Sequence, residues 1–217
     1  MARNKHPEET VDLILDVAFR LFMKKGYEYT SIQDIIDQLK GLSKGAIYHH
    51  FKSKEDIFIA VTDRITKESN RMLAAICSRS DLNGQEKLKA IFKESIFHPD
   101  QEELFTAAPD LNKNPKLLVS ILRNMVDKLV PDYILPIVKQ GISDGSIQTD
   151  YPEELAEIIM LAINVWMNPM VFEDTAEKIC RKFIVFQQMM LGFGLDIVDH
   201  EFLGRLQELA GMYQENK

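Results

Sequence analysis

The chain has 217 residues, of which 46% are hydrophobic and 27% charged, a composition typical of folded globular proteins and not of disordered chains. Two cysteines, Cys77 and Cys180, form no Cys-x-x-Cys pair, which excludes a disulfide framework and a zinc ribbon and favours a reducing, cytoplasmic compartment. The N-terminus lacks an apolar signal-peptide core, and the longest apolar stretch, 158–167, is far shorter than the ~20 residues of a membrane span. We therefore expect neither a signal peptide nor a transmembrane helix.

Charge is distributed unevenly along the chain, whose net charge is −7. Residues 1–67 carry 11 basic and 10 acidic side chains, whereas residues 68–217 carry the remaining 15 basic and 23 acidic ones. Four lysines and two adjacent histidines lie between Gln38 and Lys54 without any acidic residue. This local basic segment on an acidic protein indicates that the two parts of the chain have different tasks.

The first 80 residues predict four helices separated by short turns. Apolar residues recur at helical spacing, and the expected helices span about 7–25, 31–39, 43–49 and 54–80. Pro7 and Gly26 fit the beginning and the C-terminal cap of the first helix. Thr30 and Gln33 fit a capping box ahead of the second helix.

The remainder of the chain is also predicted to be helical. Proline, glycine and asparagine interrupt it at regular intervals, and the expected helices span about 85–98, 101–108, 115–130, 132–143, 153–168, 174–195 and 198–213. We expect Pro131 to separate the third and fourth of these helices. Because no segment alternates with a period of two, the sequence predicts an all-α fold.

The second and third helices have the layout of a helix-turn-helix motif. They are short and joined by a glycine turn, and the second of them is basic, with Ile47 and Phe51 at the spacing of a buried face. In such a motif the second helix enters the major groove of DNA.

The sequence from Thr30 to Glu55, TSIQDIIDQLKGLSKGAIYHHFKSKE, closely resembles the signature of the tetracycline-repressor (TetR) family of transcriptional regulators. The resemblance covers roughly residues 8–65, and Lys40-Gly41-Leu42 looks like a one-residue insertion in the turn relative to the family's commonest form. It implies a helix-turn-helix DNA-binding domain at 1–52, with its motif at about 31–51, and a helical dimerisation and ligand-binding domain at 53–217. It also implies a repressor that binds a palindromic operator as a homodimer and is released by a small hydrophobic effector.

Candidate DNA contacts follow from the motif. Thr30 and Ser31 lie at a helix N-terminus, where an amide and a hydroxyl can hold a phosphate oxygen. The resemblance implies that the recognition helix opens at Ser43 and faces the groove or its walls with Lys44, Gly45, Ala46, Tyr48 and His49, and that Lys54 is a further phosphate contact. The alternative is that Thr30 and Ser43 only cap helices and that the lysines are a solvated surface.

The helices expected at 153–168 and 174–195 are apolar almost all the way round, which predicts a deep core or an interface. By resemblance they pair with their copies in a four-helix bundle, and the expected interface residues are Leu155, Ile159, Ala162, Ile179, Phe183, Phe186 and Met190. The alternative is that these residues form the core of a monomer.

Methionine and aromatic residues fall in helices that surround a ligand cavity in the TetR family. The candidate ligand-binding residues are Phe92, Phe97, Phe105, Met125, Tyr133, Trp166, Met167 and Met170. Such residues suit a hydrophobic ligand, but they equally suit core packing. A family member without a small-molecule ligand, controlled by a protein partner, is therefore the alternative.

Catalysis is not indicated by the sequence. The chain has no Gly-rich phosphate loop, His-Glu-x-x-His or Gly-x-Ser-x-Gly motif, and we expect no catalytic residue, cofactor or metal. A remote alternative is a helical metal-dependent enzyme built on His98 and the acidic residues that follow it, Asp100, Glu102 and Glu103.

Overall fold

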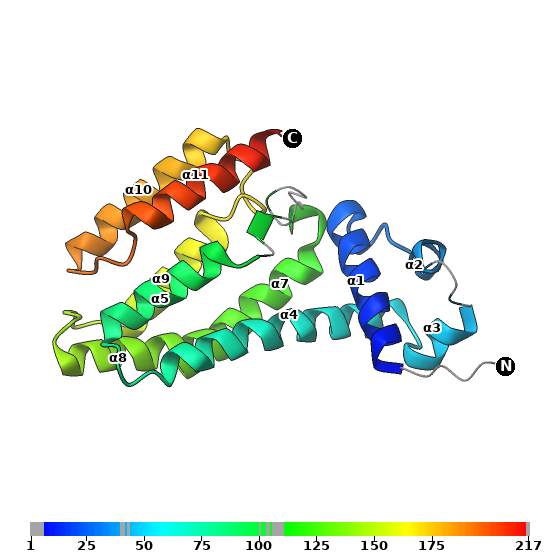
Figure 1. Ribbon diagram of the computed structural model, residues 1–217, viewed down its shortest axis with the longest axis horizontal. Helices are drawn as coiled ribbons and strands as arrows, with labels where there is room; N and C mark the ends of the chain where they lie inside the picture. Colours follow the sequence, from blue (N-terminus) through cyan, green and yellow to red (C-terminus); the bar gives the residue numbers. More distant parts are fainter. Residues whose placement is uncertain are drawn as a thin grey trace. The chain divides into compact units, whose positions relative to one another are not determined.

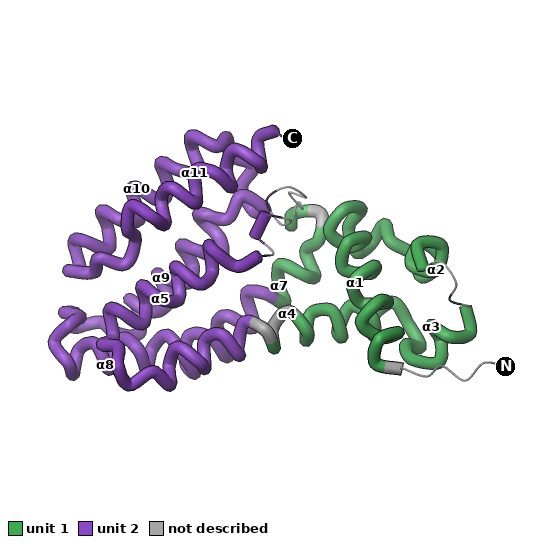
Figure 2. Tube along the Cα trace, in the orientation of Figure 1, with its two compact units in different colours: residues 1–68, 110–120 green, residues 69–109, 121–217 purple. Residues whose placement is uncertain are grey.

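The computed structural model describes residues 7–39, 42, 44–99, 101–102, 105 and 111–215, and these residues contain helices and no strand. The all-α prediction is therefore confirmed (Figure 1). The chain forms two compact units, one made of residues 1–68 with 110–120 and the other of residues 69–109 with 121–217 (Figure 2).

The smaller unit is built on four helices from the beginning of the chain. These are α1 (Pro7–Lys25), α2 (Ile32–Gln38), α3 (Lys44–His50) and the first part of α4 (Lys54–Cys77). The unit also includes the 3₁₀ turn η1 (Leu111–Lys113) and the first part of α7 (Pro115–Asn124), which come later in the chain. Gly26 has φ 91°, which confirms the predicted glycine cap of α1. The core of this unit contains Ile14, Ala18, Phe22, Ile35, Ile47 and Ile57, each at most 1% exposed.

The capping box ahead of α2 lies one residue later than predicted. Ser31 is the N-cap: its hydroxyl accepts from the Asp34 amide at 3.1 Å, and the Asp34 carboxylate accepts from the Ser31 amide at 2.8 Å. Thr30 is not the cap because it is buried and its hydroxyl donates to the Gly26 carbonyl at 2.8 Å. The assignment to Thr30 and Gln33 was therefore wrong by one position.

The larger unit consists of helices that surround a single hydrophobic cluster. They are the rest of α4, α5 (Gly84–Phe97), the rest of α7, η2 (Met125–Ile134), α8 (Leu135–Asp144), α9 (Pro152–Leu161), η3 (Ala162–Trp166), α10 (Ala176–Gly192) and α11 (His200–Glu215). Helices α10 and α11 run side by side, and α5 packs on both α8 and α11 (Figure 1). The approach of α5 to α8 is close: a Cβ on Gly84 would lie 2.3 Å from the Gly141 Cα, so only glycine fits there.

The predicted break at Pro131 is wrong. The chain stays helical from α7 into α8 because residues 125–134 form a π-helix that contains Pro131. In a π-helix the hydrogen bonds join residues i and i+5, and the helix is wider than an α-helix. The helix therefore continues through Pro131. Of the helix expected at 101–108, only Gln101, Glu102 and Phe105 are described.

Candidate nucleic-acid interface

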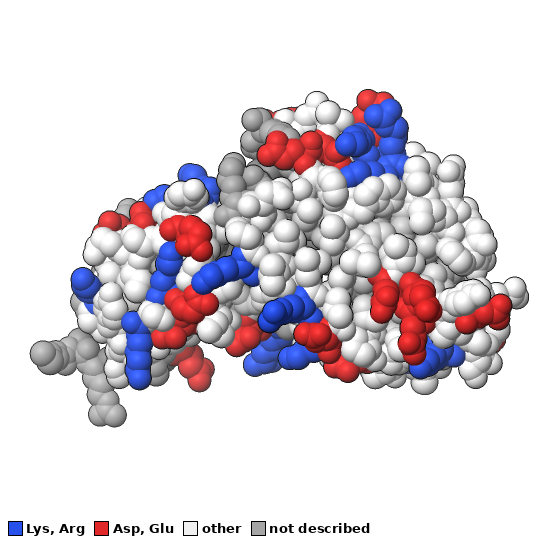
Figure 3. All heavy atoms as spheres, turned by 180° about the vertical axis from the view of Figure 1, so that it is seen from behind, with Lys and Arg blue, Asp and Glu red and all other residues white. Residues whose placement is uncertain are grey.

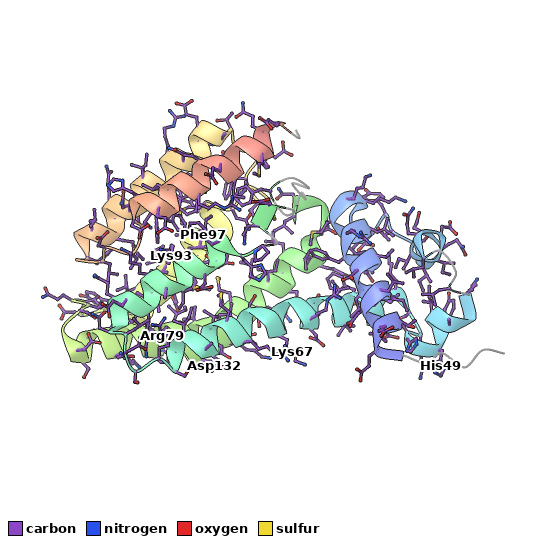
Figure 4. All side chains as sticks on the ribbon, in the orientation of Figure 1. His49, Lys67, Arg79, Lys93, Phe97 and Asp132 are labelled. Atoms are coloured by element: carbon purple, nitrogen blue, oxygen red, sulfur yellow. The ribbon has the colours of Figure 1, made fainter. Side chains whose placement is uncertain are left out.

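Helix α3 has one buried side and one exposed side. Ile47 is fully buried and Phe51, directly after the helix, is 9% exposed, so both point into the core as predicted. Lys44, Gly45, Tyr48 and His49 are exposed, and Ala46 is partly exposed. Figure 4 labels His49 on this helix. The predicted contact Ser43 lies outside the described residues, as do Lys40 and Gly41 of the predicted insertion.

Charge on the exposed side of α3 comes from a lysine that lies beside an aromatic ring. The Lys44 ammonium lies 5.8 Å from the centre of the Tyr48 ring, and Tyr48 is 42% exposed. Elsewhere on the surface, acidic and basic side chains are interspersed on the face that Figure 3 shows. A cationic and an aromatic side chain together offer a phosphate-binding charge and a flat contact surface.

The two residues predicted at the start of α2 differ in exposure. Ser31 is exposed, whereas Thr30 is 1% exposed. The Thr30 hydroxyl faces the Gly26 carbonyl, so the predicted phosphate contact from this hydroxyl does not fit the structure. Hydrogen bonds from Lys25 and Ser31 hold the pKa of Asp34 well below its usual range, so α2 already has its own anion at its N-terminus.

Tyr27 is the centre of the packing beneath the motif. It is 6% exposed, and its ring centre lies 4.8 Å from that of Phe58. Its hydroxyl donates to Glu55, and burial together with this carboxylate raises the pKa of Tyr27 above its usual range. The Lys54 ammonium donates to the Tyr27 carbonyl at 2.8 Å and lies 4.2 Å from the ring centre. Lys54 is therefore half-buried, and its role as a phosphate contact stays a prediction.

Two residues of this unit come from far along the chain. Asn114 is 1% exposed and contacts Phe22 and Tyr27, and the Lys116 ammonium lies 3.0 Å from Glu55. In the sequence, Asn114 with Pro115 indicated only a helix boundary. No local signal could have found these contacts, because they join residues more than 60 positions apart.

The candidate ligand-binding residues lie mostly in the core of the larger unit. Phe92, Phe105, Met125 and Met167 are buried in its hydrophobic cluster, and Tyr133 and Trp166 pack against it, while Met170 is half-buried and Phe97 is 40% exposed. Figure 4 labels Phe97 at the end of α5. An open hollow of about 370 Å³ lies instead in the smaller unit, lined by Glu8, Val11, Asp12 and His50.

The seven residues predicted at a dimer interface are all buried within one chain. Leu155, Ile159, Ala162, Ile179, Phe183, Phe186 and Met190 are each at most 7% exposed and belong to the core cluster. The large apolar residues that α9 and α10 expose are different ones: Ile158 and Leu161 on α9, and Ile184, Val185, Met189 and Leu191 on α10, between 41% and 51% exposed. Helical periodicity located these apolar helices correctly but not their exposed faces.

The metal-site alternative gains no support from the described residues. Among them no group of three metal-ligating side chains occurs, and Glu102 forms an ion pair with Arg205 at 2.6 Å. Asp100 and Glu103 lie outside the described residues. Within the described part of the chain, no helix is long and apolar enough to cross a bilayer.

A capped short helix followed by a second short helix, which has a buried apolar side and an exposed basic side, defines a helix-turn-helix DNA-binding protein. Residues 14–61 match the family model of bacterial regulatory proteins, tetR family. This segment therefore carries the DNA-binding domain of the TetR family, and the match, together with the repressor relatives, supports a transcriptional regulator of that family. The proteins of the matched family model and the repressor relative KstR2 are transcriptional regulators and not enzymes, in agreement with the expectation for this chain.

Two repressor relatives resemble the chain in sequence, and a solved structure shares its fold. The HTH-type transcriptional repressor Rv1474c of Mycobacterium tuberculosis is 34% identical over 88 residues, which are 41% of each chain. The HTH-type transcriptional repressor KstR2 of Rhodococcus jostii is 26% identical over 66% of this chain and 70% of its own length. The crystal structure of a TetR-family regulator from Agrobacterium tumefaciens has a TM-score of 0.60 at 23% identity, covering 86% of this chain and 97% of its own. That likeness extends the shared fold beyond the motif.

Proposed function

We propose that this chain is a repressor that binds a palindromic operator as a homodimer, acts in the cytoplasm and is released by a small hydrophobic effector. The observation that carries the DNA-binding part is the exposed side of α3, with Lys44, Tyr48 and His49 around a buried Ile47. Two such helices in a dimer would read half-sites about 34–36 Å apart, one turn of DNA. An effector that binds better when this spacing is wrong would release the operator.

Each exposed position of α3 suits a different contact with DNA. Gly45 has no side chain, which lets the backbone approach the groove closely, and the Ala46 methyl suits a thymine methyl. Lys44 suits a guanine edge or a phosphate. Tyr48 and His49 suit phosphate oxygens at the groove wall, where hydroxyl and imidazole N–H groups can donate.

Lys44→Ala and Tyr48→Ala should each weaken operator binding by roughly 1–3 kcal/mol without unfolding the protein. Both side chains are exposed and make few contacts that the fold needs. Fluorescence anisotropy with an operator selected from a random-centre duplex library measures the affinity, and circular dichroism checks the fold. Lys67→Ala is the matched control, because Lys67 is an exposed lysine of α4 (Figure 4) and its removal makes the same change in net charge.

The same titrations at several salt concentrations measure how much of the DNA affinity comes from contacts between basic side chains and phosphates. For the wild type we expect affinity to fall steeply with salt, and for a variant that loses one phosphate contact we expect the slope of log affinity against log salt to decrease by about one. Unchanged affinity in both α3 variants would contradict the assignment of the recognition helix. A wild-type slope near zero would contradict phosphate binding altogether.

Support for the homodimer comes from the apolar residues that the larger unit leaves exposed. Ile158 and Leu161 are one turn apart on α9. On α10, Val185 lies one turn before Met189 and Ile184 lies two turns before Leu191, so the four form a broad exposed apolar side of that helix. Apolar residues grouped on a helix face are typical of protein interfaces. We therefore assign the dimer contact to these residues, in place of the buried seven.

Support for an effector comes from the family and from one fold neighbour. A regulator from Saccharomonospora viridis, with a TM-score of 0.54 and 18% identity over 96% of this chain and 97% of its own, was solved in complex with choline. For this chain the effector would be bound by residues of the larger unit, among which Tyr133, Trp166 and Met170 are half-buried and could move aside.

A second candidate is a TetR-type DNA-binding protein without a small-molecule ligand. The tight packing of Phe92 favours it, because this ring stacks on Phe186 at 5.6 Å and lies 5.9 Å from Phe202. A screen of apolar and amphipathic small molecules separates the two candidates. A true effector should raise the melting temperature and lower operator affinity together, since binding to one conformer depletes the other.

A further inference from the structure

Asn114 joins two parts of the α1–α2 connection through its side-chain amide. The amide nitrogen donates to the Phe22 carbonyl at 3.1 Å, and the amide oxygen accepts from the Tyr27 amide N–H at 2.5 Å. Asn114 is 1% exposed, so solvent water does not reach these two hydrogen bonds. Residues 110–120, which include Asn114, belong to the compact unit of the helix-turn-helix (Figure 2).

The end of α1 explains why this bridge is needed. Gly26 is left-handed and its N–H donates to the Phe22 carbonyl at 2.9 Å, which is the single bond of an αL cap. In the fuller Schellman cap, the N–H of the following residue, here Tyr27, would bond directly to a carbonyl of the helix. Here the Asn114 amide lies between the Phe22 carbonyl and the Tyr27 N–H and connects them. It therefore completes the cap of a helix that lies about 90 residues earlier in the chain.

The bridge is made instead of the local bond that such an asparagine usually forms. The Asn114 carbonyl accepts from the Leu118 N–H at 3.0 Å, and Pro115 is the first residue of α7, which places Asn114 at the helix N-cap. An N-cap asparagine normally accepts from an amide of its own first turn. The Asn114 side-chain oxygen accepts instead from Tyr27.

Tyr27 in turn fixes where α2 begins. Its carbonyl accepts from the Thr30 N–H at 3.3 Å and from the Lys54 ammonium at 2.8 Å, and the next residue, Ser31, is the N-cap of α2. One tight turn connects Tyr27 to α2, so the position of the Tyr27 backbone determines where α2 begins. Helix α3 comes next in the chain. A residue that holds the Tyr27 backbone therefore sets the orientation of the motif.

We infer that Asn114 is a positioning residue for DNA recognition: a side chain outside the helix-turn-helix motif that holds the motif in the orientation that sequence-specific binding requires. The inference rests on the proposed DNA-binding function. Non-specific binding depends on charge and tolerates a tilted α3, whereas contacts to base edges depend on its orientation. Loss of the Asn114 bridge should therefore reduce specific binding far more than non-specific binding.

The test compares Asn114→Ala with the wild type on two duplexes. One duplex is that enriched from a random-centre library by the wild-type protein, and the other is a scrambled duplex of equal length and composition. At a temperature at which circular dichroism shows the variant to be folded, we expect affinity for the enriched duplex to fall at least tenfold and affinity for the scrambled duplex to change less than twofold. Asn83→Ala is the matched control: it removes the N-cap asparagine of α5 in the larger unit and should change neither affinity.

Other outcomes separate the possible failures. Equal affinity of Asn114→Ala and wild type for the enriched duplex overturns the inference, as does an equal loss on both duplexes, which would indicate general destabilisation. If Asn114→Ala does not fold, Asn114→Asp decides by the same comparison, since it keeps the acceptor for Tyr27 and loses the donor to Phe22; if that variant also fails to fold, Asn114 is a folding residue and the inference is wrong. A wild type that enriches no duplex contradicts the proposed function instead.

Discussion

Replacing Lys182 with Met should destabilise the larger unit by about 3–5 kcal/mol, the cost of removing one partner from a buried ion pair. Lys182 and Asp174 are 8% and 5% exposed and form a salt bridge. The Lys182 ammonium also donates to the Trp166 carbonyl at 2.6 Å and lies 4.2 Å from the centre of the Phe172 ring. Its removal leaves a buried carboxylate whose one remaining ion-pair partner among the described residues is the exposed Lys178.

Urea unfolding followed by circular dichroism measures this loss. Arg181→Met is the matched control, because the neighbouring Arg181 forms an ion pair with Glu177 in which both side chains are more than half exposed. Such a pair contributes at most about 1 kcal/mol, so this variant should remain close to the wild type. The double variant Lys182→Met with Asp174→Asn should regain part of the loss, since it no longer buries an unpaired charge. Equal stability of the two single methionine variants would contradict this account.

The ion pair also predicts a dependence on pH. Burial raises the pKa of Asp174, but hydrogen bonds from Lys178 and Lys182 outweigh it and leave the pKa below its usual value. A carboxyl group whose pKa is lower in the folded than in the unfolded state stabilises the fold above the unfolded value of about 4, and this contribution is lost as the pH falls further. The stability difference between wild type and Asp174→Asn should therefore diminish below about pH 4.

The fold class and most helices could be predicted because the necessary information is local. The apolar periodicity of α1 and α4, the glycine cap at Gly26 and the prolines that begin α7 and α9 all act within one or two turns of the chain. The inward direction of Ile47 and Phe51 followed from their spacing of four residues. A family signature in the same segment then identified the class of protein.

The errors concern features that tertiary packing decides. Thr30 and Ser31 are both good caps, and burial of Thr30 against the Gly26 carbonyl selects Ser31. Pro131 usually ends a helix, but the π-helical turn around it lets the helix continue. The bridge from Asn114 to Tyr27 joins residues 87 positions apart, so no local pattern contains it.

The seven residues predicted at a dimer interface are buried within one chain for the same reason, because periodicity cannot tell which side of an apolar helix its own chain covers. Adjacent residues of α10 distinguish its buried side from its exposed side. Phe183 is 7% exposed and its ring lies 5.4 Å from that of Phe202, whereas Ile184 is 43% exposed. A glutamate in place of Phe183 would be buried and unpaired, whereas a glutamate in place of Ile184 would face solvent in a single chain.

Phe183→Glu should therefore unfold the larger unit, since it loses a buried aromatic side chain, at about 3–5 kcal/mol, and adds the cost of a buried carboxylate. Ile184→Glu should leave the helical content and melting of the isolated chain intact but shift the protein from dimer to monomer, because two like charges would meet in the apolar contact that we propose. Sedimentation velocity at micromolar concentration, together with circular dichroism, measures both results. A wild type that sediments as a monomer would contradict the dimer proposal. A dimer that tolerates Ile184→Glu and also Met189→Glu would place the contact on a surface other than this face of α10.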